Sequence, residues 1–199
     1  GALVSIDTRR AAVMEAALAA GARIVNDVSA LRHDPASTGI VARSGAAVVL
    51  MHAPGAGDNL HSGGGYRDVV DEVVAFLAAR RDAAVAGGIA RERIVLDPGI
   101  GFGKTPADNL ALLRGLARLH ALGQPLMIGA SRKRMIATLS AGEAPDHRLG
   151  GSIALALAAI DAGAQIVRVH DVDETAQAIR VWRALRPGSS AIRPAAPAD

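Results

Sequence analysis

Short apolar runs rich in β-branched residues alternate with alanine-rich stretches along almost the whole chain. Six such runs end in polar residues, at 3–6, 24–25, 47–50, 94–96, 125–128 and 166–169. Runs that are apolar on both faces are typical of parallel strands covered by helices. The pattern therefore predicts six strands of a parallel α/β fold, each followed by a helix.

The segments between the runs support repeated strand–helix units. Val69, Val73, Phe76 and Leu77 have the spacing i, i+4, i+7 and i+8, which gives one helix face that packs on a sheet. Glycines suited to left-handed helix C-caps stand shortly before four of the runs, at Gly21, Gly45, Gly123 and Gly163. Repetition of one such unit is typical of barrels and doubly wound sheets.

Composition narrows the class of protein. With 199 residues, 50% of them hydrophobic, one domain with a real core is expected. The net charge of +3 suits an anionic ligand, but aromatic residues make up only 2% and leave few rings for stacking bases, so no nucleic-acid partner is expected. The only basic run is 132–134, and the tail 187–199, rich in Pro, Ala and Ser, is predicted to be disordered.

Cellular location is inferred from three absences. The chain has no cysteine, which excludes disulfides and thiolate chemistry and favours a reducing compartment. The longest apolar run, 153–160, is far shorter than the roughly 20 residues of a membrane helix. Residues 1–10 carry Asp7 and no long apolar segment, unlike a secretory signal. We expect a cytoplasmic protein with no membrane partner.

Polar side chains follow nearly every predicted strand: Asp7 and Thr8, Asn26 and Asp27, His52, Asp97, Ser131, and His170 with Asp171. Parallel α/β folds bind ligands at this carboxyl edge. Helix caps and turns also favour these residue types, and that explanation alone suffices for Thr8, Asp27 and Asp171. The remaining carboxylates and amides exceed what capping requires, and buried charges need a partner. The sequence predicts a functional site at this edge.

A glycine-rich loop at 99–105 follows the fourth strand. It does not match the Walker pattern, which requires glycine where Pro98 stands, nor the Rossmann pattern, which requires glycine at Lys104. The loop therefore does not indicate an NTPase or a dinucleotide enzyme. We interpret it as a mobile loop that carries Phe102 over the site.

Six segments together resemble the dihydropteroate synthase family of folate biosynthesis. They are Ser5-Ile-Asp-Thr8, residues 24–28 and 50–52, the loop 96–104, Gly129-Ala-Ser-Arg-Lys133, and Arg168-Val-His-Asp171. The segments occur in the order and at the spacing of that family, and the similarity covers about residues 3–185. It implies a TIM-type (β/α)₈ barrel, of which six units lie in this chain, and a pterin-binding domain over 1–186.

The resemblance also implies parts that lie before residue 1. The family has two further βα units there, which carry an asparagine that helps to hold Mg²⁺ and two loops that close over the second substrate. We therefore expect an N-terminally incomplete barrel with no metal ligand of its own, able to bind a pterin with negligible turnover. A fragment, a partner chain and a different closure of the sheet all remain open, and the family suggests a homodimer.

The resemblance implies how a reduced pterin is bound. Asp97 accepts from the amino and amide edge, Asn26 and Asp7 contact other ring nitrogens, and Lys133 donates to the carbonyl side. A carboxylate can accept two parallel N–H bonds, which fits such an edge. The walls of the pterin site would be Val28, Met51, Phe102 and Gly129.

The implied reaction is a transferase reaction. The amine of 4-aminobenzoate displaces pyrophosphate from 6-hydroxymethyl-7,8-dihydropterin pyrophosphate and gives 7,8-dihydropteroate. Arg168 and His170, two residues apart on one strand, face the same side and would bind the leaving anion; with Lys133 they are the predicted catalytic residues. Ser131 and the stem of Lys133 would form the floor under the aminobenzoate ring. His52 has no firm role, and Lys104 is expected at most to fix the loop.

Two other functions remain open. Another pterin-binding barrel, such as a methyltetrahydrofolate:corrinoid methyltransferase, would show cobalamin-dependent activity. An inactive pterin-binding or structural fragment would show no turnover. The residues Ser131-Arg-Lys133, together with the glycine loop, favour the synthase over the methyltransferase.

Overall fold

The computed structural model describes residues 2–55, 59–62 and 64–186. Six strands follow one another in sequence order, and all their pairings are parallel: β1 (Ser5–Asp7), β2 (Ile24–Asp27), β3 (Ala47–Met51), β4 (Ile94–Asp97), β5 (Met127–Ile128) and β6 (Ile166–Val167). Each of the six predicted runs contains part of one strand. The tail predicted to be disordered, 187–199, lies outside the described residues.

The strand array is weakest between β4 and β5. Strands β1 to β4 form one sheet and β5 and β6 a second. The two sheets are joined by a parallel bridge between Leu96 and Leu126 and by the N–H of Leu96 donating to the C=O of Pro125 at 2.9 Å. We call this junction the β4–β5 seam.

Strands β5 and β6 are shorter than the runs 125–128 and 166–169 predicted. Arg168 still donates its N–H to the C=O of Ile128 at 2.9 Å. The N–H of His170 instead donates to the hydroxyl of Ser131 at 3.2 Å. The main-chain ladder ends there because a side chain replaces the main-chain partner.

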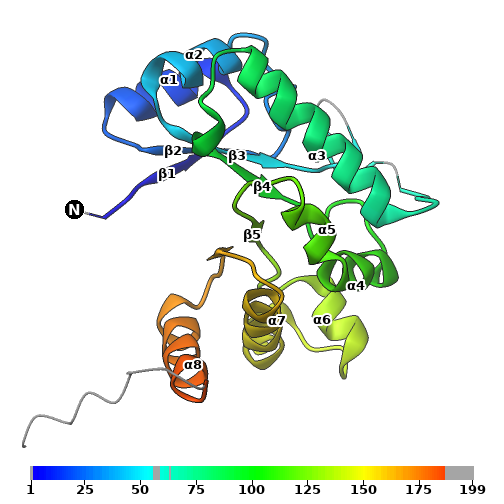
Figure 1. Cartoon of the computed structure of the whole chain (residues 1–199). Helices are drawn as coiled ribbons and strands as arrows, with labels where there is room; N and C mark the ends of the chain where they lie inside the picture. Colours follow the sequence, from blue (N-terminus) through cyan, green and yellow to red (C-terminus); the bar gives the residue numbers. More distant parts are fainter. Residues whose placement is uncertain (1, 56–58, 63, 187–199) are drawn as a thin grey trace, which may run out of the picture.

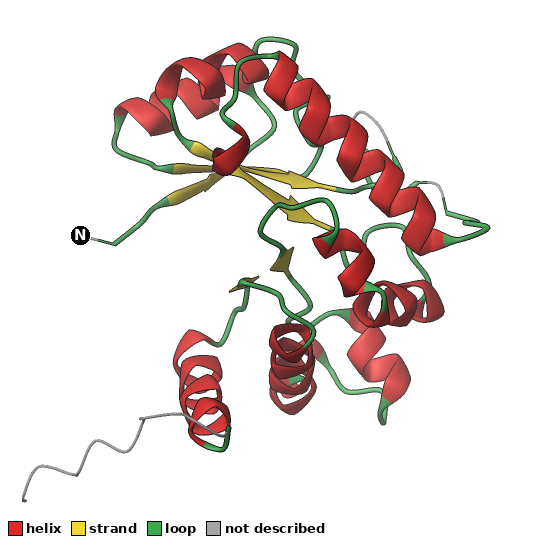
Figure 2. Ribbon diagram, viewed as in Figure 1, coloured by secondary structure: helices red, strands yellow, loops and turns green. Residues whose placement is uncertain are grey.

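Eight helices in the described part of the chain lie around the outside of the strands (Figures 1 and 2). They are α1 (Ala11–Ala19), α2 (Ser37–Ser44), α3 (Val69–Ala86), α4 (Pro106–Arg114), α5 (Leu116–His120), α6 (Arg134–Leu139), α7 (Leu149–Asp161) and α8 (Val172–Ala184), with short 3₁₀ turns at Arg91–Arg93 and Pro145–His147. Strands inside and helices outside are the arrangement of part of a TIM-type barrel. None of these helices is both long and apolar enough to cross a membrane.

The predicted helix face of α3 is confirmed. Val69, Val73 and Leu77 are buried and Phe76 packs against the same core. The helix begins after Asp68, whose carboxylate accepts the N–H groups of Val70 and Asp71, both at 2.9 Å. All four predicted C-cap glycines have positive φ, between 66° and 104°.

Apolar side chains fill the space between strands and helices, with Met14, Leu50, Leu77, Leu96 and Ile128 among the largest fully buried ones. The inward-facing side chains of the strands surround a cavity of about 280 Å³ instead, and its lining includes Val49, Val95, Met127 and, at the carboxyl ends, Asp7, Asn26 and Arg168. Three polar residues near the strand ends, Asp7, Asn26 and Arg168, therefore stand at the mouth of the barrel interior.

Candidate active site

Asp97 ends β4 and is 5% exposed. One carboxylate oxygen accepts the N–H of Gly99 at 2.7 Å, and the other has no hydrogen-bond partner among the described residues. Burial raises the pKa of Asp97 to about 6, opposed by that hydrogen bond and by the charges of Lys104, Lys133 and Arg168. The carboxylate is therefore desolvated and free to accept from a ligand on one side.

Asp7 and Asn26 meet Arg168 at the mouth of the barrel interior. The amide nitrogen of Asn26 donates to Oδ2 of Asp7 at 2.9 Å, and the guanidinium of Arg168 donates to the same oxygen at 3.2 Å. Oδ1 of Asn26 is buried and has no partner within the described residues. Because a buried acceptor without a donor costs about 1–3 kcal/mol, this oxygen marks a place where a ligand N–H would bind.

The Asp7–Arg168 ion pair was not predicted, because the sequence assigned Arg168 to an anion. The two side chains are 49% and 63% exposed, and exposed ion pairs contribute only about 0–1 kcal/mol. Arg168 can therefore exchange this carboxylate for a more highly charged ligand at little cost.

The ring of Phe102 contacts two basic side chains, Lys133 and His61. Nζ of Lys133 is 4.5 Å from the centroid of its ring, and the imidazole of His61 stacks on it with centroids 4.8 Å apart and planes inclined by 9°. Burial lowers the pKa of Lys133, opposed by Asp97. Lys133 is thus brought beside both the predicted wall residue Phe102 and the buried carboxylate.

Of the other predicted wall residues, Val28 and Met51 share a small cluster with Phe102, whereas Gly129 has room for a Cβ atom. Val28 and Met51 pack in one small cluster with Phe102, separate from the main core. A Cβ added at Gly129 would lie 3.9 Å from Cβ of Arg168, an ordinary contact. The protein alone therefore gives no steric reason for glycine at 129.

The glycine loop is fastened by Lys104. Its Nζ donates to the carbonyls of Gly99 at 2.9 Å and Phe102 at 3.1 Å and lies 2.9 Å from Nδ1 of His52. Burial lowers the pKa of Lys104 to about 7 and that of His52 to about 3, so His52 is neutral and can accept. A Cβ at Gly99 (φ 69°) would lie 1.9 Å from the carbonyl oxygen of His52, so only glycine fits.

These contacts contradict the expectation of a mobile loop. The expectation was based on the flexibility of the glycines and left out Lys104. Its ammonium binds loop carbonyls that regular secondary structure would otherwise bind. The two residues without a firm predicted role, His52 and Lys104, are the anchor of the loop.

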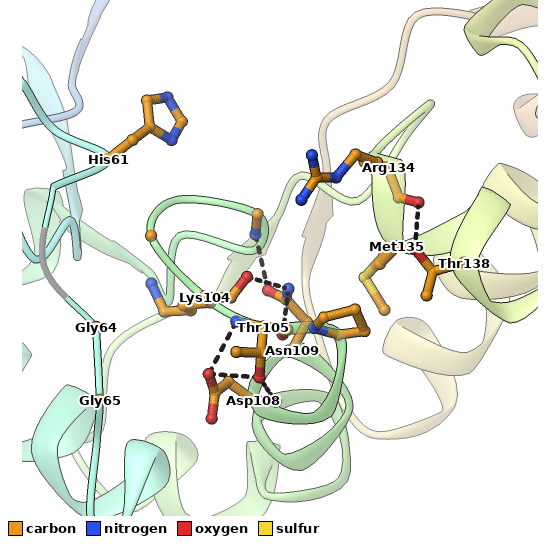
Figure 3. Close-up of a pocket in the computed structure, with 13 residues that line it drawn as sticks. His61, Gly64, Gly65, Lys104, Thr105, Asp108, Asn109, Arg134, Met135 and Thr138 are labelled. Carbon is orange, nitrogen blue, oxygen red and sulfur yellow. Dashed lines mark hydrogen bonds between the residues drawn. The ribbon is translucent and has the colours of Figure 1, made fainter.

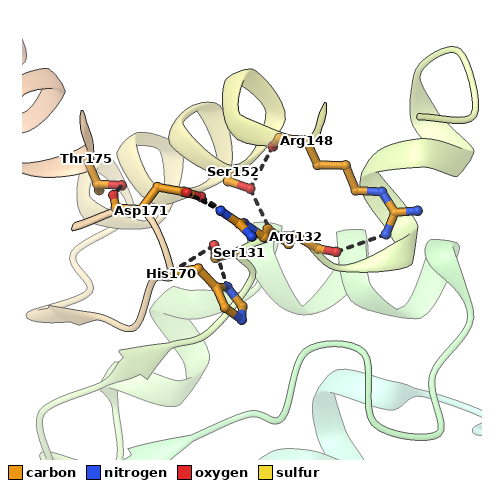
Figure 4. A network of polar contacts seen from close by, with 7 residues as sticks. All are labelled: Ser131, Arg132, Arg148, Ser152, His170, Asp171 and Thr175. Atoms are coloured by element: carbon orange, nitrogen blue, oxygen red, sulfur yellow. Dashed lines mark hydrogen bonds and ion pairs between the residues drawn. The ribbon is translucent and has the colours of Figure 1, made fainter. Parts of the chain in front are cut away.

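Ser131 and His170 form a contact between the chain after β5 and the chain after β6 (Figure 4). Oγ of Ser131 accepts the N–H of His170 at 3.2 Å and lies 3.0 Å from its Nδ1. This contact leaves Nε2 of His170 on the far side of the ring. The sequence predicted both residues but not their hydrogen bond.

The capping explanation holds for two of the three residues to which it was applied. Oδ1 of Asp27 accepts from the N–H and the hydroxyl of Ser29, and Oγ1 of Thr8 accepts the N–H of Arg10. Asp171 differs, because its carboxylate makes no capping hydrogen bond in α8 and pairs with Arg132. Asp171 therefore occupies the N-cap position of α8, but its side chain pairs with Arg132 instead of capping the helix.

A second pocket, of about 640 Å³, lies beside the glycine loop (Figure 3). His61 and Arg134 stand on opposite sides of it, and Gly101 and Gly103, which flank Phe102, also line it. No described residue makes a hydrogen bond or ion pair with the guanidinium of Arg134. The sequence reading missed Arg134, although its place directly after Lys133 in the one basic run was a usable signal.

Known proteins resemble this chain over most of its length. A sequence profile described as "Pterin binding enzyme" matches residues 1–170. The chain belongs to the pterin-binding enzyme family. A fellow pterin-binding enzyme, the dihydropteroate synthase of Neisseria meningitidis serogroup C, is 46% identical over 187 residues, which are 93% of this chain and 66% of the relative. The chain thus spans just under two thirds of the length of such curated relatives.

Solved structures of pterin-binding enzymes confirm the predicted barrel class. Xanthomonas albilineans dihydropteroate synthase in complex with 7,8-dihydropteroate has a TM-score of 0.85 at 47% identity, over 92% of this chain and 66% of that one. The Thermus thermophilus enzyme in complex with 4-aminobenzoate has a TM-score of 0.87 at 46% identity, over 93% and 75%.

Proposed function

We propose that the protein is a dihydropteroate synthase, a transferase that joins 6-hydroxymethyl-7,8-dihydropterin pyrophosphate to 4-aminobenzoate and releases pyrophosphate. The observation that carries the proposal is the buried Asp97 carboxylate with one free oxygen at the end of β4, together with the unpartnered Oδ1 of Asn26 in β2. Both are acceptors in a mouth that also holds Lys133 and Arg168. The bound molecules named for two relatives support the same substrates.

The pterin would lie over these acceptors. Asp97, ionised above pH 6, would accept from the amino and amide N–H groups, and Asn26 and Asp7 would contact the other ring nitrogens. The ammonium of Lys133 would donate to the carbonyl side, and Val28, Met51 and Phe102 would enclose the ring. Gly129 would let the main chain approach it.

The chemical step needs a stabilised leaving anion. The C–O bond between the pterin methylene carbon and pyrophosphate breaks, the amine nitrogen of 4-aminobenzoate bonds to that carbon, and the amine then loses a proton to water. Arg168 would leave Asp7 and bind the pyrophosphate with its planar fork, while His170 donates from Nε2. Lys133 adds positive charge on the pterin side.

The second substrate would enter the pocket of about 640 Å³ beside Phe102. Ser131 and the stem of Lys133 would support its ring; neither lines this pocket, but the stem of Lys133 lies beside Gly101, which does. Arg134 supplies a cation that no described residue pairs, which suits the carboxylate of 4-aminobenzoate.

Magnesium, location and assembly complete the proposal. Within 2–55, 59–62 and 64–186 no three His, Asp or Glu side chains are grouped to hold a metal ion, so these residues do not fit a protein-bound Mg²⁺ and we route no step through one. We propose one pterin-binding domain over 1–186, a cytoplasmic location and a homodimer. The suggested contact is Val181 and Leu185, which are exposed on and just after α8 and line an apolar groove between α7 and α8.

The test is pyrophosphate release with both substrates and magnesium, together with calorimetric pyrophosphate binding. We expect Arg168→Lys to weaken pyrophosphate binding about tenfold or more, because a point charge does not replace the planar fork. Arg118→Lys, which alters an equally exposed Arg–Asp pair, is the control. Equal affinities in wild type and Arg168→Lys would remove Arg168 from the anion site, and turnover that requires cobalamin would favour a corrinoid methyltransferase.

A further inference from the structure

Arg132 has a main-chain conformation that its residue type rarely adopts. Its φ is 56°, in the left-handed region, although it is neither glycine nor asparagine. Non-glycine residues persist there when the surroundings determine the conformation, and such positions gather at functional sites. The cause therefore has to be sought in the contacts of Arg132.

Three separate contacts hold Arg132. Its N–H donates to Oγ of the buried Ser152 at 2.9 Å, and its C=O accepts from Arg148 at 2.9 Å. Its guanidinium forms a two-pronged ion pair with Asp171, with Nε 3.0 Å from Oδ2 and Nη2 bonded to Oδ1. Figure 4 shows these partners arriving from α7, from the residue just before it and from the chain after β6. The main chain and the side chain of Arg132 are thus both fixed.

The residues on either side of Arg132 serve the site. Ser131 holds the ring and the N–H of His170, and Lys133 lies over Phe102 near Asp97. The left-handed turn at Arg132 separates these two neighbours, so its conformation sets where each of them points. Asp171 is itself adjacent to His170.

The ion pair also supplements a weak connection. Strands β5 and β6 pair through only two residues each. Beyond them the two chains are tied by the N–H of Arg168 donating to the C=O of Ile128, by the Ser131–His170 contact and by Arg132–Asp171. Without the ion pair, the Ser131–His170 contact would be the side-chain link left between the two chains near Lys133 and His170.

We propose that Arg132 and Asp171 are a positioning pair that fixes Lys133 and His170 relative to each other, and that Arg148 and Ser152 hold the strained turn in place. Neither member touches the substrate in this assignment. The effect on turnover rests on the proposed synthase function; the effect on the local geometry does not.

The experiment compares Asp171→Asn, Asp171→Glu and Arg132→Ala with the control Asp161→Asn, which weakens another Arg–Asp pair at Arg186. Each variant of the full chain is measured for thermal midpoint, pyrophosphate affinity by calorimetry, and amide hydrogen exchange at His170. We expect Asp171→Asn and Arg132→Ala to weaken pyrophosphate binding about tenfold or more and to speed exchange at His170. Asp171→Glu should restore much of both, and Asp161→Asn should change neither.

Wild-type pyrophosphate affinity and wild-type exchange at His170 in Asp171→Asn would overturn the proposal. Loss of affinity that follows the thermal midpoint equally in Asp171→Asn and Asp161→Asn would also overturn it, because it would show a purely structural role. If the wild type binds no pyrophosphate, the proposed anion site fails, while the exchange at His170 still decides whether the pair positions that residue.

Discussion

Replacing Asp97 with asparagine should raise stability and lower pterin affinity in the same protein. The carboxylate is 5% exposed and accepts one hydrogen bond, from Gly99. Asparagine keeps that acceptor and removes the buried charge, but it presents a donor where the pterin presents donors. The free protein becomes more stable because the buried charge is gone. The complex becomes weaker because the pterin loses its acceptor.

The magnitude follows from the pKa of Asp97. Its ordinary value is 3.8, and burial raises it to about 6 in the folded protein. Between these pH values the folded state holds the proton more tightly than the unfolded state, so stability falls as pH rises through this window. The difference between the two pKa values corresponds to about 3 kcal/mol of folding stability. The protein has this stability below pH 4 and has lost it above pH 6. Asparagine does not titrate and loses nothing.

The assay is urea unfolding of both proteins without ligand, at steps from pH 3.5 to 8, with the free energy of unfolding extrapolated to water. We expect the difference between variant and wild type to shift by about 3 kcal/mol in favour of the variant as pH rises. Constant costs of the new amide cancel in this shift. The titration of His52, whose pKa is about 3, occurs in both proteins and also cancels. The titration of Lys104 does not cancel, because burial lowers its pKa to about 7 against the charge of Asp97, so the shift is read below about pH 6.5.

Two results would refute the reasoning. A difference that stays flat from pH 3.5 to 8 would mean that the Asp97 charge is not desolvated. Unchanged pterin affinity at pH 7.5, where about a tenfold to hundredfold loss is expected from a mispaired buried group, would remove Asp97 from the pterin site.

Two further substitutions test the loop and the second pocket. Lys104→Met removes the donor to the carbonyls of Gly99 and Phe102, so we expect a loss of about 1–3 kcal/mol in urea unfolding and faster proteolysis within the loop; an unchanged midpoint would show that the loop is held by other contacts. Arg134→Gln should weaken 4-aminobenzoate binding about tenfold and leave pyrophosphate binding unchanged, as measured by calorimetry with and without the pterin. A parallel loss of both affinities would contradict a separate role for Arg134.

Much of the fold and the site was predictable from local patterns. Strand runs, the face of α3 and the C-cap glycines depend on neighbouring residues, and parallel pairing places strand ends together whatever the details. Asp97, Asn26 and Arg168 could be grouped for that reason alone. The shortness of β5 and β6 was not predictable, because the ladder ends at a side-chain contact between Ser131 and His170 that are 39 positions apart.

The roles of single side chains depended on tertiary contacts. Lys104 was expected at most to fix its loop, and its Nζ does donate to the carbonyls of Gly99 and Phe102. Asp171 resembles a helix cap, yet it pairs with Arg132, and no residue pattern signals the left-handed φ of that arginine. The sequence therefore predicted which residues gather at the site, but not which of their side chains already pair with another residue of the protein.

The β4–β5 seam divides the acceptors of the site from its donors. Asp7, Asn26 and Asp97 belong to the four-stranded sheet, whereas Lys133 and Arg168 follow the two-stranded one. A pterin bound by the acceptors and the donors together would connect the two sheets across the β4–β5 seam, where the strands share a single bridge. Ligand binding would then stiffen the molecule as a whole, and the empty protein would open first along this line.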